Sequence, residues 1–372
     1  MSVLAVILLL AVLIFVHELG HFLAARLQGI YANRFSLGFG PIVWKYQGTQ
    51  TEYALRALPL GGFVGFPDDD PDSNIPPNDP NLLKNRPVLD RAIVISAGVI
   101  ANLLFAYLVL VAQMGLVGMP SIQYNPGVLI PKVMPQDVAA QAGVQDGDVV
   151  LAIDGKPVPF TQRETSTLEI STEATTALRN AIESHPNQPL NLLIRRQNDQ
   201  VNLTVTPKEA EGKGRIGIQL QPNIQPQPDG KLTYYKRTST VLQLFSWAAD
   251  EFQQNVVRTV QGFGQLLSNF STTAEQVAGP VAIVATGARI AQSDASSLFN
   301  FASLISINLA IINILPLPAL DGGQLAFLLV EGVRGKPLPN RIQEGVMQTG
   351  LVLLLGLGVF LIIRDTVNLI PQ

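Results

Sequence analysis

The residues of this chain that could do chemistry begin with the pentad His17-Glu18-Leu19-Gly20-His21, which lies inside an apolar run. On a helix, residues four positions apart share one face, so the two imidazoles can bind the same zinc ion. The carboxylate of Glu18 is then placed to take a proton from a water molecule on that ion. The pattern predicts a hydrolytic zinc site with His17 and His21 as ligands and Glu18 as the general base.

A catalytic zinc ion usually has three protein ligands and one water molecule, so a third ligand is needed. The chain has no cysteine and three histidines, and His185 lies in a polar stretch typical of a solvated loop. The third ligand should therefore be a carboxylate. Asp321 follows Pro316 and Pro318, which break the preceding helix and can bend the chain inward. An Asp-Gly pair alone is more often a turn, but beside an incomplete histidine pair Asp321 is the predicted ligand.

Asn313 lies eight residues before Asp321 in the same proline-broken segment. One interpretation is a simple hydrogen bond at a helix end. The other is that the amide donates to the substrate carbonyl, or to the oxyanion that forms during cleavage. We favour the second interpretation.

The composition favours a membrane protein. Of the 372 residues, 47% are hydrophobic and 14% are charged, and the net charge of -3 gives no basis for nucleic-acid binding. Four apolar stretches approach or exceed the length that crosses a lipid bilayer. They predict a polytopic α-helical membrane protein. The predicted transmembrane helices are 1–27, 91–118, 298–323 and 346–364.

Lys and Arg residues near the ends of the spans predict the orientation. They gather in the loop after the first span and in the loop between the third and fourth, so both loops should be cytoplasmic. The amino terminus and the long segment between the second and third spans should lie outside. The three predicted ligands then fall nearer the cytoplasmic face. The basic residues concerned are Arg26, Arg34, Lys84, Arg86, Arg91, Arg334, Lys336 and Arg341.

The segments between the spans predict the rest of the fold. Residues 28–90 alternate strand-like runs with glycines and should form a β-loop. Residues 119–210 alternate strands, turns and helices, which predicts a soluble α/β domain, followed by a proline-rich linker at 211–237. Residues 238–290 carry apolar side chains at helical spacing. We expect membrane-associated amphipathic helices there, rather than helices packed on a soluble domain.

The pentad HELGH and the motif Asn313-x-x-Pro316-x-Pro318-x-x-Asp321-Gly322 resemble those of the site-2 protease family of intramembrane zinc metalloproteases. The resemblance covers nearly the whole chain. It is greatest to the bacterial regulator-of-sigma-E protease type.

Three further segments carry the resemblance. Residues 36–41 resemble the family's membrane re-entrant β-loop, residues 127–207 resemble a PDZ domain, and residues 279–283 resemble a stretch that precedes the third span. Typical members of that type have two PDZ domains in tandem, whereas this chain has room for one. We therefore do not expect this chain to exclude uncut substrates by means of a pair of PDZ domains.

The resemblance implies that Zn²⁺ is held by His17, His21 and Asp321, with Glu18 catalytic. It also implies that Asn308, together with the asparagine at 313, helps to hold the substrate backbone. The implied substrates are single-span membrane proteins, often anti-sigma factors or signal-peptide remnants, cleaved after a first cut has removed the outer domain.

Cleavage within a membrane needs an extended substrate, because the carbonyl of a helical peptide bond is hydrogen-bonded and shielded by side chains. A re-entrant strand around Gly38 to Phe66, with Gly38, Phe39 and Gly40 as the named pairing residues, could pair with the substrate by strand addition. The PDZ-like segment could add a peptide ligand at its sheet edge, or it could be a spacer without a ligand.

Two other functions are compatible with parts of the pattern. A membrane-bound PDZ scaffold with a non-catalytic metal site would be expected to have lost one of the four site residues, and all four are present. A metal transporter would need polar residues in several spans, and 91–118 and 346–364 have few. The sequence favours an intramembrane zinc endopeptidase of the bacterial cytoplasmic (inner) membrane, with an internal photosynthetic membrane as the open alternative location.

Overall fold

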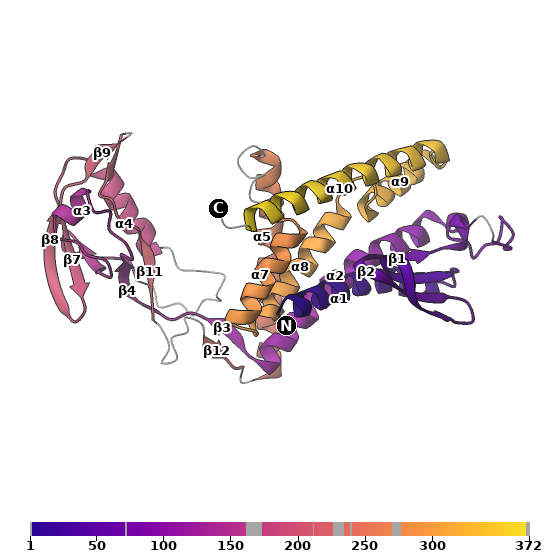
Figure 1. Ribbon diagram of the computed structural model, residues 1–372, viewed down its shortest axis with the longest axis horizontal. Helices are drawn as coiled ribbons and strands as arrows, with labels where there is room; N and C mark the ends of the chain where they lie inside the picture. Colours follow the sequence, from indigo (N-terminus) through magenta and orange to yellow (C-terminus); the bar gives the residue numbers. More distant parts are fainter. Residues whose placement is uncertain are drawn as a thin grey trace. The chain divides into compact units, whose positions relative to one another are not determined.

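The computed structural model describes residues 2–70, 73–160, 173–210, 212–225, 234–238, 240–269 and 277–369. The chain divides into two compact units. One is formed by Met1–Val117 together with Ser239–Gln372, and the other by Gly118–Thr238 (Figure 1). The first unit is mainly helical, and the second is built around a β-sheet.

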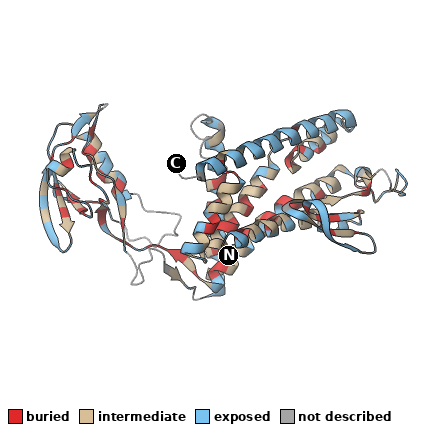
Figure 2. Cartoon of the chain, viewed as in Figure 1, coloured by how far each residue is buried: buried red, intermediate tan, exposed pale blue. Residues whose placement is uncertain are grey.

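Four helices in the described part of the first unit are long and apolar enough to cross a membrane. They are α1 (Ser2–Leu27), α2 (Val88–Leu116), α8 (Ser297–Ile314) and α10 (Asn340–Leu369). Their outer surfaces carry large apolar side chains, and α10 is exposed along most of its length, with Leu353 and Phe360 among the exposed residues (Figure 2). Apolar surface of this extent is suited to lipid rather than to water.

The third predicted span extends too far, because α8 ends at Ile314. Pro316 and Pro318 have no backbone N–H, so the helical hydrogen-bond ladder cannot continue through them. A separate helix, α9 (Asp321–Arg334), begins directly after this break, and Gly335 caps its C-terminal end in a left-handed conformation. Much of the loop expected between the third and fourth spans is therefore helical.

Two further helices of this unit are α5 (Val241–Ser268) and α7 (Pro280–Ser293), in the region where amphipathic helices are expected. α5 turns a polar face inward, since Glu251, Asn255 and Thr259 are buried. Several of its large apolar side chains face outward, which suits a helix in contact with lipid. The exposed apolar residues are Val241, Leu242, Phe245, Val257 and Val260.

The loop between α1 and α2 folds into a small sheet of two long, bent strands, β1 (Arg34–Gln47) and β2 (Glu52–Gly65), followed by short 3-10 turns at Pro67–Asp69 and Leu83–Asn85. Segment 34–39 pairs in parallel with 52–58 and antiparallel with 62–65. Segment 42–47 pairs antiparallel with the other side of the 52–58 segment. The two edges of the sheet are therefore 62–65 and 42–47.

The second unit consists of β3 (Met119–Ser121), β4 (Tyr124–Leu129), α3 (Val138–Gln141), β5 (Val149–Ile153), β6 (Lys156–Pro157), α4 (Glu173–Ser184), β7 (Leu190–Arg196), β8 (Asp199–Val205), β9 (Lys208–Ala210), β10 (Lys213–Arg215), β11 (Gln221–Ile224) and β12 (Tyr234–Lys236). The main sheet has the order β11-β4-β5-β7-β8, with β6 paired to β5. Its apolar core includes Ile130, Val150, Leu178, Leu192 and Ile194.

The linker expected at 211–237 contains strands in the structure. β11 pairs antiparallel with β4, and β12 pairs antiparallel with β3. Pro222 is compatible with this pairing because β11 lies at the edge of the sheet, where a missing N–H on the outer side costs little. The unit spans 118–238, so its last strands, β10, β11 and β12, lie beyond the range 119–210 expected for the domain.

Candidate metal centre

Helices α1 and α2 cross in close backbone contact at Gly20. A Cβ atom at residue 20 would lie 2.4 Å from the carbonyl oxygen of Ala97 and 2.7 Å from Cβ of Ala101. Small residues on both helices therefore allow the close approach. The crossing brings the imidazoles of α1 against α2, where Nδ1 of His21 donates to the carbonyl oxygen of Val94 at 2.8 Å.

The three predicted ligands meet at one point, although Asp321 is far from the histidines in sequence. Nε2 of His17 and Nε2 of His21 are 3.2 Å apart. Oδ2 of Asp321 lies 3.2 Å from Nε2 of His17 and 3.3 Å from Nε2 of His21. The three side chains are buried or half-buried and form a group that could hold a metal ion.

These donor atoms fit a zinc ion. Tetrahedral zinc with bonds of about 2.0–2.1 Å has neighbouring ligand atoms about 3.3 Å apart, close to the three separations seen here. Because His21 donates through Nδ1, its Nε2 carries a lone pair in the neutral ring. Oδ2 of Asp321 is buried and accepts no hydrogen bond from the residues that the structure describes. Buried lone pairs that face one another need a cation, so the group is suited to a divalent metal.

The loop 315–320 and a glycine after it bring Asp321 to the histidines. Ala319 adopts a left-handed backbone with a φ of 69°, which costs a residue with a side chain about 1 kcal/mol. A Cβ atom at Gly322 would lie 2.1 Å from the carbonyl oxygen of Leu315. Only glycine therefore lets α9 begin this close to the loop. Asp321 is the first residue of α9, where the helix N-terminus favours a carboxylate.

Glu18 lies between the metal ligands and one edge of the small sheet. A Cβ atom at Gly62 would lie 2.8 Å from Cγ of Glu18, and the backbone of Val64 donates a hydrogen bond to the Glu18 carboxylate. The carbonyl of Gly65 is turned inward and accepts from the N–H of Asn33. By alternation along the strand, the backbone groups of Gly62 and Val64 point outward. No strand in the described part of the chain pairs with this edge, so it is open beside Glu18.

A pocket of about 510 Å³ contains these groups. Its walls come from α1, the 62–65 edge, the segment before α2, α2 itself, the loop before α9, and α9. Several polar side chains from these segments line the pocket. The lining residues are His17, Glu18, His21, Gly62, Phe63, Val64, Phe66, Asp68, Leu83, Lys84, Arg91, Val94, Ile95, Ala319, Asp321 and Gln324.

An ion pair joins α2 to α9 at this pocket. Nη1 of Arg91 donates to both carboxylate oxygens of Glu331, at 2.8 and 3.0 Å. The two side chains are 18% and 15% exposed. Because α9 begins with Asp321 and α2 contacts the histidines, the pair connects the helices that position the three ligands.

Of the other polar residues considered in the sequence, one reaches the metal centre and two do not. Nδ2 of Asn313 lies 3.4 Å from Nε2 of His17, so this amide reaches the centre. Asn308 is half-buried on the same helix and is not among the residues that line the pocket. His185 belongs to the second unit, where its Nδ1 lies 2.8 Å from the carbonyl oxygen of Ala181.

The residues expected to pair with a substrate strand lie at a bend in β1. Gly38 and Gly40 have positive φ angles of 89° and 84°. Phe39 between them pairs with Leu58 inside the sheet. That Gly38, Phe39 and Gly40 pair with a substrate strand stays a prediction. The open edge beside Glu18 is segment 62–65, which lies within the wider strand region around Gly38 to Phe66.

Helix α2 supplies contacts to the histidines that the sequence analysis missed. The carbonyl of Val94 accepts from His21, and Nδ2 of Asn102 lies 3.2 Å from Nδ1 of His17. Gly98 lies between these two residues and leaves room for both rings. The sequence does offer one signal for Asn102, which is an asparagine in an apolar span. A polar side chain is costly there and usually has a function.

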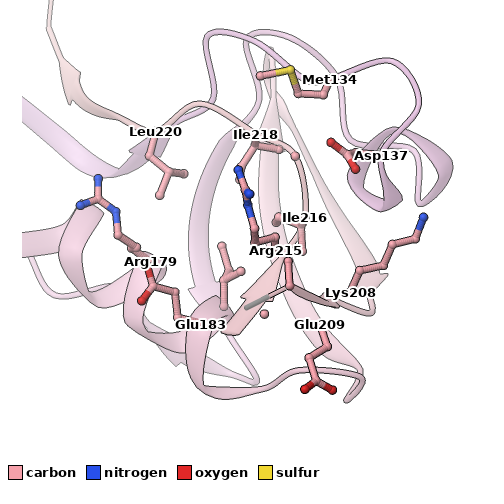
Figure 3. Close-up of a pocket in the computed structure, with 14 residues that line it drawn as sticks. Met134, Asp137, Arg179, Glu183, Lys208, Glu209, Arg215, Ile216, Ile218 and Leu220 are labelled. Atoms are coloured by element: carbon pink, nitrogen blue, oxygen red, sulfur yellow. The ribbon is translucent and has the colours of Figure 1, made fainter. Parts of the chain in front are cut away.

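The second unit has a pocket of its own, about 700 Å³ in volume, beside α4 and segment 214–220. Figure 3 shows Arg215 in the middle of this pocket, Asp137 at one end, and Arg179 and Glu183 at the other. The pocket combines apolar and charged groups, as ligand sites do. The apolar lining residues are Met134, Ile182, Ile216, Ile218 and Leu220.

Comparisons with known proteins agree with this site. The model of peptidase family M50 matches residues 5–357. A protein of Nostoc sp. whose name includes the words zinc metalloprotease is 60% identical, covering 100% of this chain and 98% of that protein. The chloroplastic membrane metalloprotease ARASP of Arabidopsis thaliana is 46% identical, covering 99% of this chain and 79% of that protein.

A more distant relative is the regulator of sigma-E protease RseP of Salmonella typhimurium, which is 29% identical and covers 96% of this chain and 97% of that protein. Among solved structures, this chain is similar to the PDZ domain of an SdrC-like protein from Listeria monocytogenes. The match covers 26% of this chain and 88% of that chain, with 17% identity and a TM-score of 0.20. The family match includes all four site residues, the second and third spans in full, and most of the first span. This integral membrane protein therefore belongs to peptidase family M50, and the resemblance of its motifs to site-2 proteases is confirmed.

Proposed function

We propose that this chain is an intramembrane zinc endopeptidase that cleaves the transmembrane segments of single-span membrane proteins. The observation that supports this most is the convergence of His17, His21 and Asp321 within 3.3 Å of one another, with Glu18 in the same pocket. Membership of a peptidase family, and relatives named as metalloproteases, support the same reaction.

The chain's own residues suit peptide hydrolysis. Zinc held by the two histidines and Asp321 would supply a Lewis acid that polarises the scissile carbonyl and makes water more acidic. Glu18 accepts the proton that the attacking water gives up and returns it to the nitrogen of the leaving amine. The Asn313 amide, which reaches the centre, donates to the carbonyl oxygen as that oxygen gains negative charge.

The substrate would bind as a strand along segment 62–65. The outward backbone groups of Gly62 and Val64 lie beside Glu18 and are free to pair with an added strand, once Val64 exchanges its hydrogen bond with Glu18. Strand addition would hold the scissile bond extended next to the metal ligands. Within the strand region around Gly38 to Phe66, this proposal gives the pairing to segment 62–65 rather than to Gly38, Phe39 and Gly40.

The substrate class follows from the site's depth and from the relatives. His21 lies six residues before the end of α1, about 9 Å along the helix axis, so the site is within the membrane near one face. We infer that this face is cytoplasmic, with the amino terminus and the second unit outside, in a bacterial cytoplasmic or internal photosynthetic membrane. Anti-sigma factors or signal-peptide remnants are the expected substrates, and one relative is named as a regulator of sigma-E protease.

We also infer that the second unit is a single PDZ-like domain whose pocket binds a peptide. Strand addition along segment 214–220, opposite α4, would use the apolar lining and place charged peptide groups near Arg215 and Glu183. Replacing the exposed Arg215 with glutamate should change which peptides bind. Identical peptide-array profiles for the wild type and Arg215→Glu would contradict a peptide ligand at this pocket.

Co-expression with a single-span protein that lacks its outer domain and carries a tag at each end tests the proteolytic function. The wild type should release two tagged fragments, whereas Glu18→Gln should bind zinc but accumulate the uncut substrate. Glu344→Gln, an exposed carboxylate on α10, is the matched control and should cleave normally. Equal amounts of uncut substrate with the wild type and Glu18→Gln, across a panel of such substrates, would favour a scaffold with a non-catalytic metal site.

A further inference from the structure

We propose that Asn102 is a positioning residue that orients His17 for metal binding by accepting a hydrogen bond from its Nδ1–H. The inference rests on the proposed metal site of His17, His21 and Asp321. It concerns a residue of α2 that lies outside the family motifs discussed above and does not reach the donor atoms of the site.

The ring of His17 must carry its hydrogen on one particular nitrogen. Nε2 of His17 lies 3.2 Å from Nε2 of His21 and 3.2 Å from Oδ2 of Asp321, so this nitrogen faces the site. A neutral imidazole has one N–H, and the nitrogen that binds a metal ion must be the other one. Nδ1 of His17 is then a donor. Because the residue is buried, this donor needs an acceptor within the protein.

Asn102 is placed to provide that acceptor. Its side-chain amide lies 3.2 Å from Nδ1 of His17 through Nδ2, and the residue is completely buried. Its Oδ1 is buried and has no hydrogen-bond partner among the described residues. Turning the amide by 180° exchanges oxygen and nitrogen and leaves all other atoms in place. The amide oxygen then accepts from Nδ1–H of His17.

The same arrangement already exists for the second histidine. Nδ1 of His21 donates to the carbonyl oxygen of Val94, on the same helix as Asn102. Ser306 of α8 donates to the backbone carbonyl of Asn102 at 2.8 Å, which holds this turn of α2 against α8. One helix thus provides an acceptor for each ring. The two acceptors would fix both rings with Nε2 toward the metal ion.

Helix packing alone does not require an amide at this position. A leucine has the same branching at Cγ and would fill a buried site in an apolar helix. An acceptor is needed only if the orientation of the His17 ring matters. Loss of a partner that orients a metal-binding histidine typically weakens metal affinity about 10–100-fold.

Zinc affinity separates a role in orienting His17 from a role in helix packing alone. It is measured on three variants of the full-length protein, purified in detergent, by competition for zinc with a chromogenic chelator. Asn102→Leu should weaken zinc binding about 10–100-fold. Asn102→Asp retains an oxygen acceptor of the same shape and should bind zinc nearly as tightly as the wild type. Gln113→Leu is the matched control, since it removes another fully shielded amide from the same helix and should leave zinc affinity unchanged.

Equal zinc affinity in Asn102→Leu and the wild type would overturn the proposal. So would an equal loss in Asn102→Leu and Asn102→Asp, because the acceptor would then not matter. Absence of zinc binding by the wild type would instead contradict the proposed function itself.

A measurement on the wild type does not depend on whether a variant folds. The chain has three histidines, so nitrogen-15 NMR of histidine-labelled, zinc-loaded protein can resolve every ring. The His17 ring should be protonated at Nδ1 and metal-bound at Nε2. A ring that binds the metal through Nδ1, or lacks a proton there, would exclude the role assigned to Asn102.

Discussion

Gly98 of α2 and His21 of α1 are in such close contact that a Cβ atom at residue 98 would lie 2.3 Å from Nε2 of His21. The same atom would lie 2.8 Å from Cε1 of His17. The space that both rings occupy therefore depends on the absence of a side chain on the facing helix. A single methyl group is enough to test this relationship.

Gly98→Ala should bind zinc less tightly, because its methyl group must push one or both histidine rings away from Asp321. We expect zinc affinity to fall about tenfold or more, measured by chelator competition and by zinc content after dialysis. Gly356→Ala, on α10, is the control, because no atom lies within 4 Å of the added Cβ there. Undiminished zinc affinity in Gly98→Ala would show that the rings can be displaced without loss of the site.

Val64→Pro should abolish cleavage but retain zinc. Proline removes the N–H that points outward from the 62–65 edge, and the inward hydrogen bonds of this strand remain. The readout is release of tagged fragments from a single-span substrate, together with zinc content. Lys45→Pro, at the opposite edge of the same sheet, is the matched control and should cleave normally. Cleavage by Val64→Pro at the wild-type rate would exclude substrate pairing at this edge.

Gly322→Ala should displace the third ligand. Its Cβ would lie 2.1 Å from the carbonyl oxygen of Leu315, so α9 would have to move away from the loop and carry Asp321 with it. We expect weaker zinc binding and a loss of about 1–3 kcal/mol in stability. Gly332→Ala on the same helix meets only Val88 at 3.9 Å and should be neutral or slightly stabilising. The comparison uses thermal unfolding and zinc affinity, and similar values for the two variants would contradict this account of Gly322.

Removal of Glu331 should destabilise the protein and weaken zinc binding, because Arg91 would remain largely buried without its partner. Glu331→Ala should cost about 1.5–3 kcal/mol, measured as a shift in thermal unfolding. Lys45→Ala breaks a more exposed pair, Lys45 with Glu52 at 3.7 Å, and should cost less than about 1 kcal/mol. A double-mutant cycle over Arg91 and Glu331 measures the coupling directly, and a coupling near zero would mean that the pair does not hold α9 in place.

Part of this site follows from local sequence patterns. The spacing of His17 and His21 specifies a shared helix face, and the need for a third, carboxylate ligand indicates Asp321. Pro316 and Pro318 also indicated a helix break, although the predicted span continued to residue 323, beyond the end of α8 at Ile314. These inferences succeed because each depends on covalent geometry over a few residues.

Other parts depend on which segments meet in space. The expected strand region around Gly38 to Phe66 includes segment 62–65, but the sequence does not single out that segment as the open edge beside Glu18. The contributions of Val94, Gly98 and Asn102 were missed for the same reason, because they arise from the crossing of α1 and α2. Long-range strand order and helix crossings are set by tertiary packing, which local patterns do not encode.

The helix α9 was missed for a local reason. It begins with Asp321-Gly322-Gly323, and glycines usually indicate a turn or a helix end. In the structure both glycines allow close contact with the preceding loop, and the helix continues to Arg334. A glycine required for close packing and a glycine required for a turn look the same in a single sequence.

The most direct test of the central claim is the zinc coordination of the purified protein, measured by metal analysis and zinc-edge X-ray absorption. The wild type should bind one zinc ion per chain, with two imidazole nitrogens and a carboxylate oxygen at about 2.0–2.2 Å. Asp321→Ala should lose the carboxylate oxygen from the coordination shell and most of the zinc affinity. A wild type without zinc, or an Asp321→Ala variant with unchanged affinity and spectrum, would contradict the account.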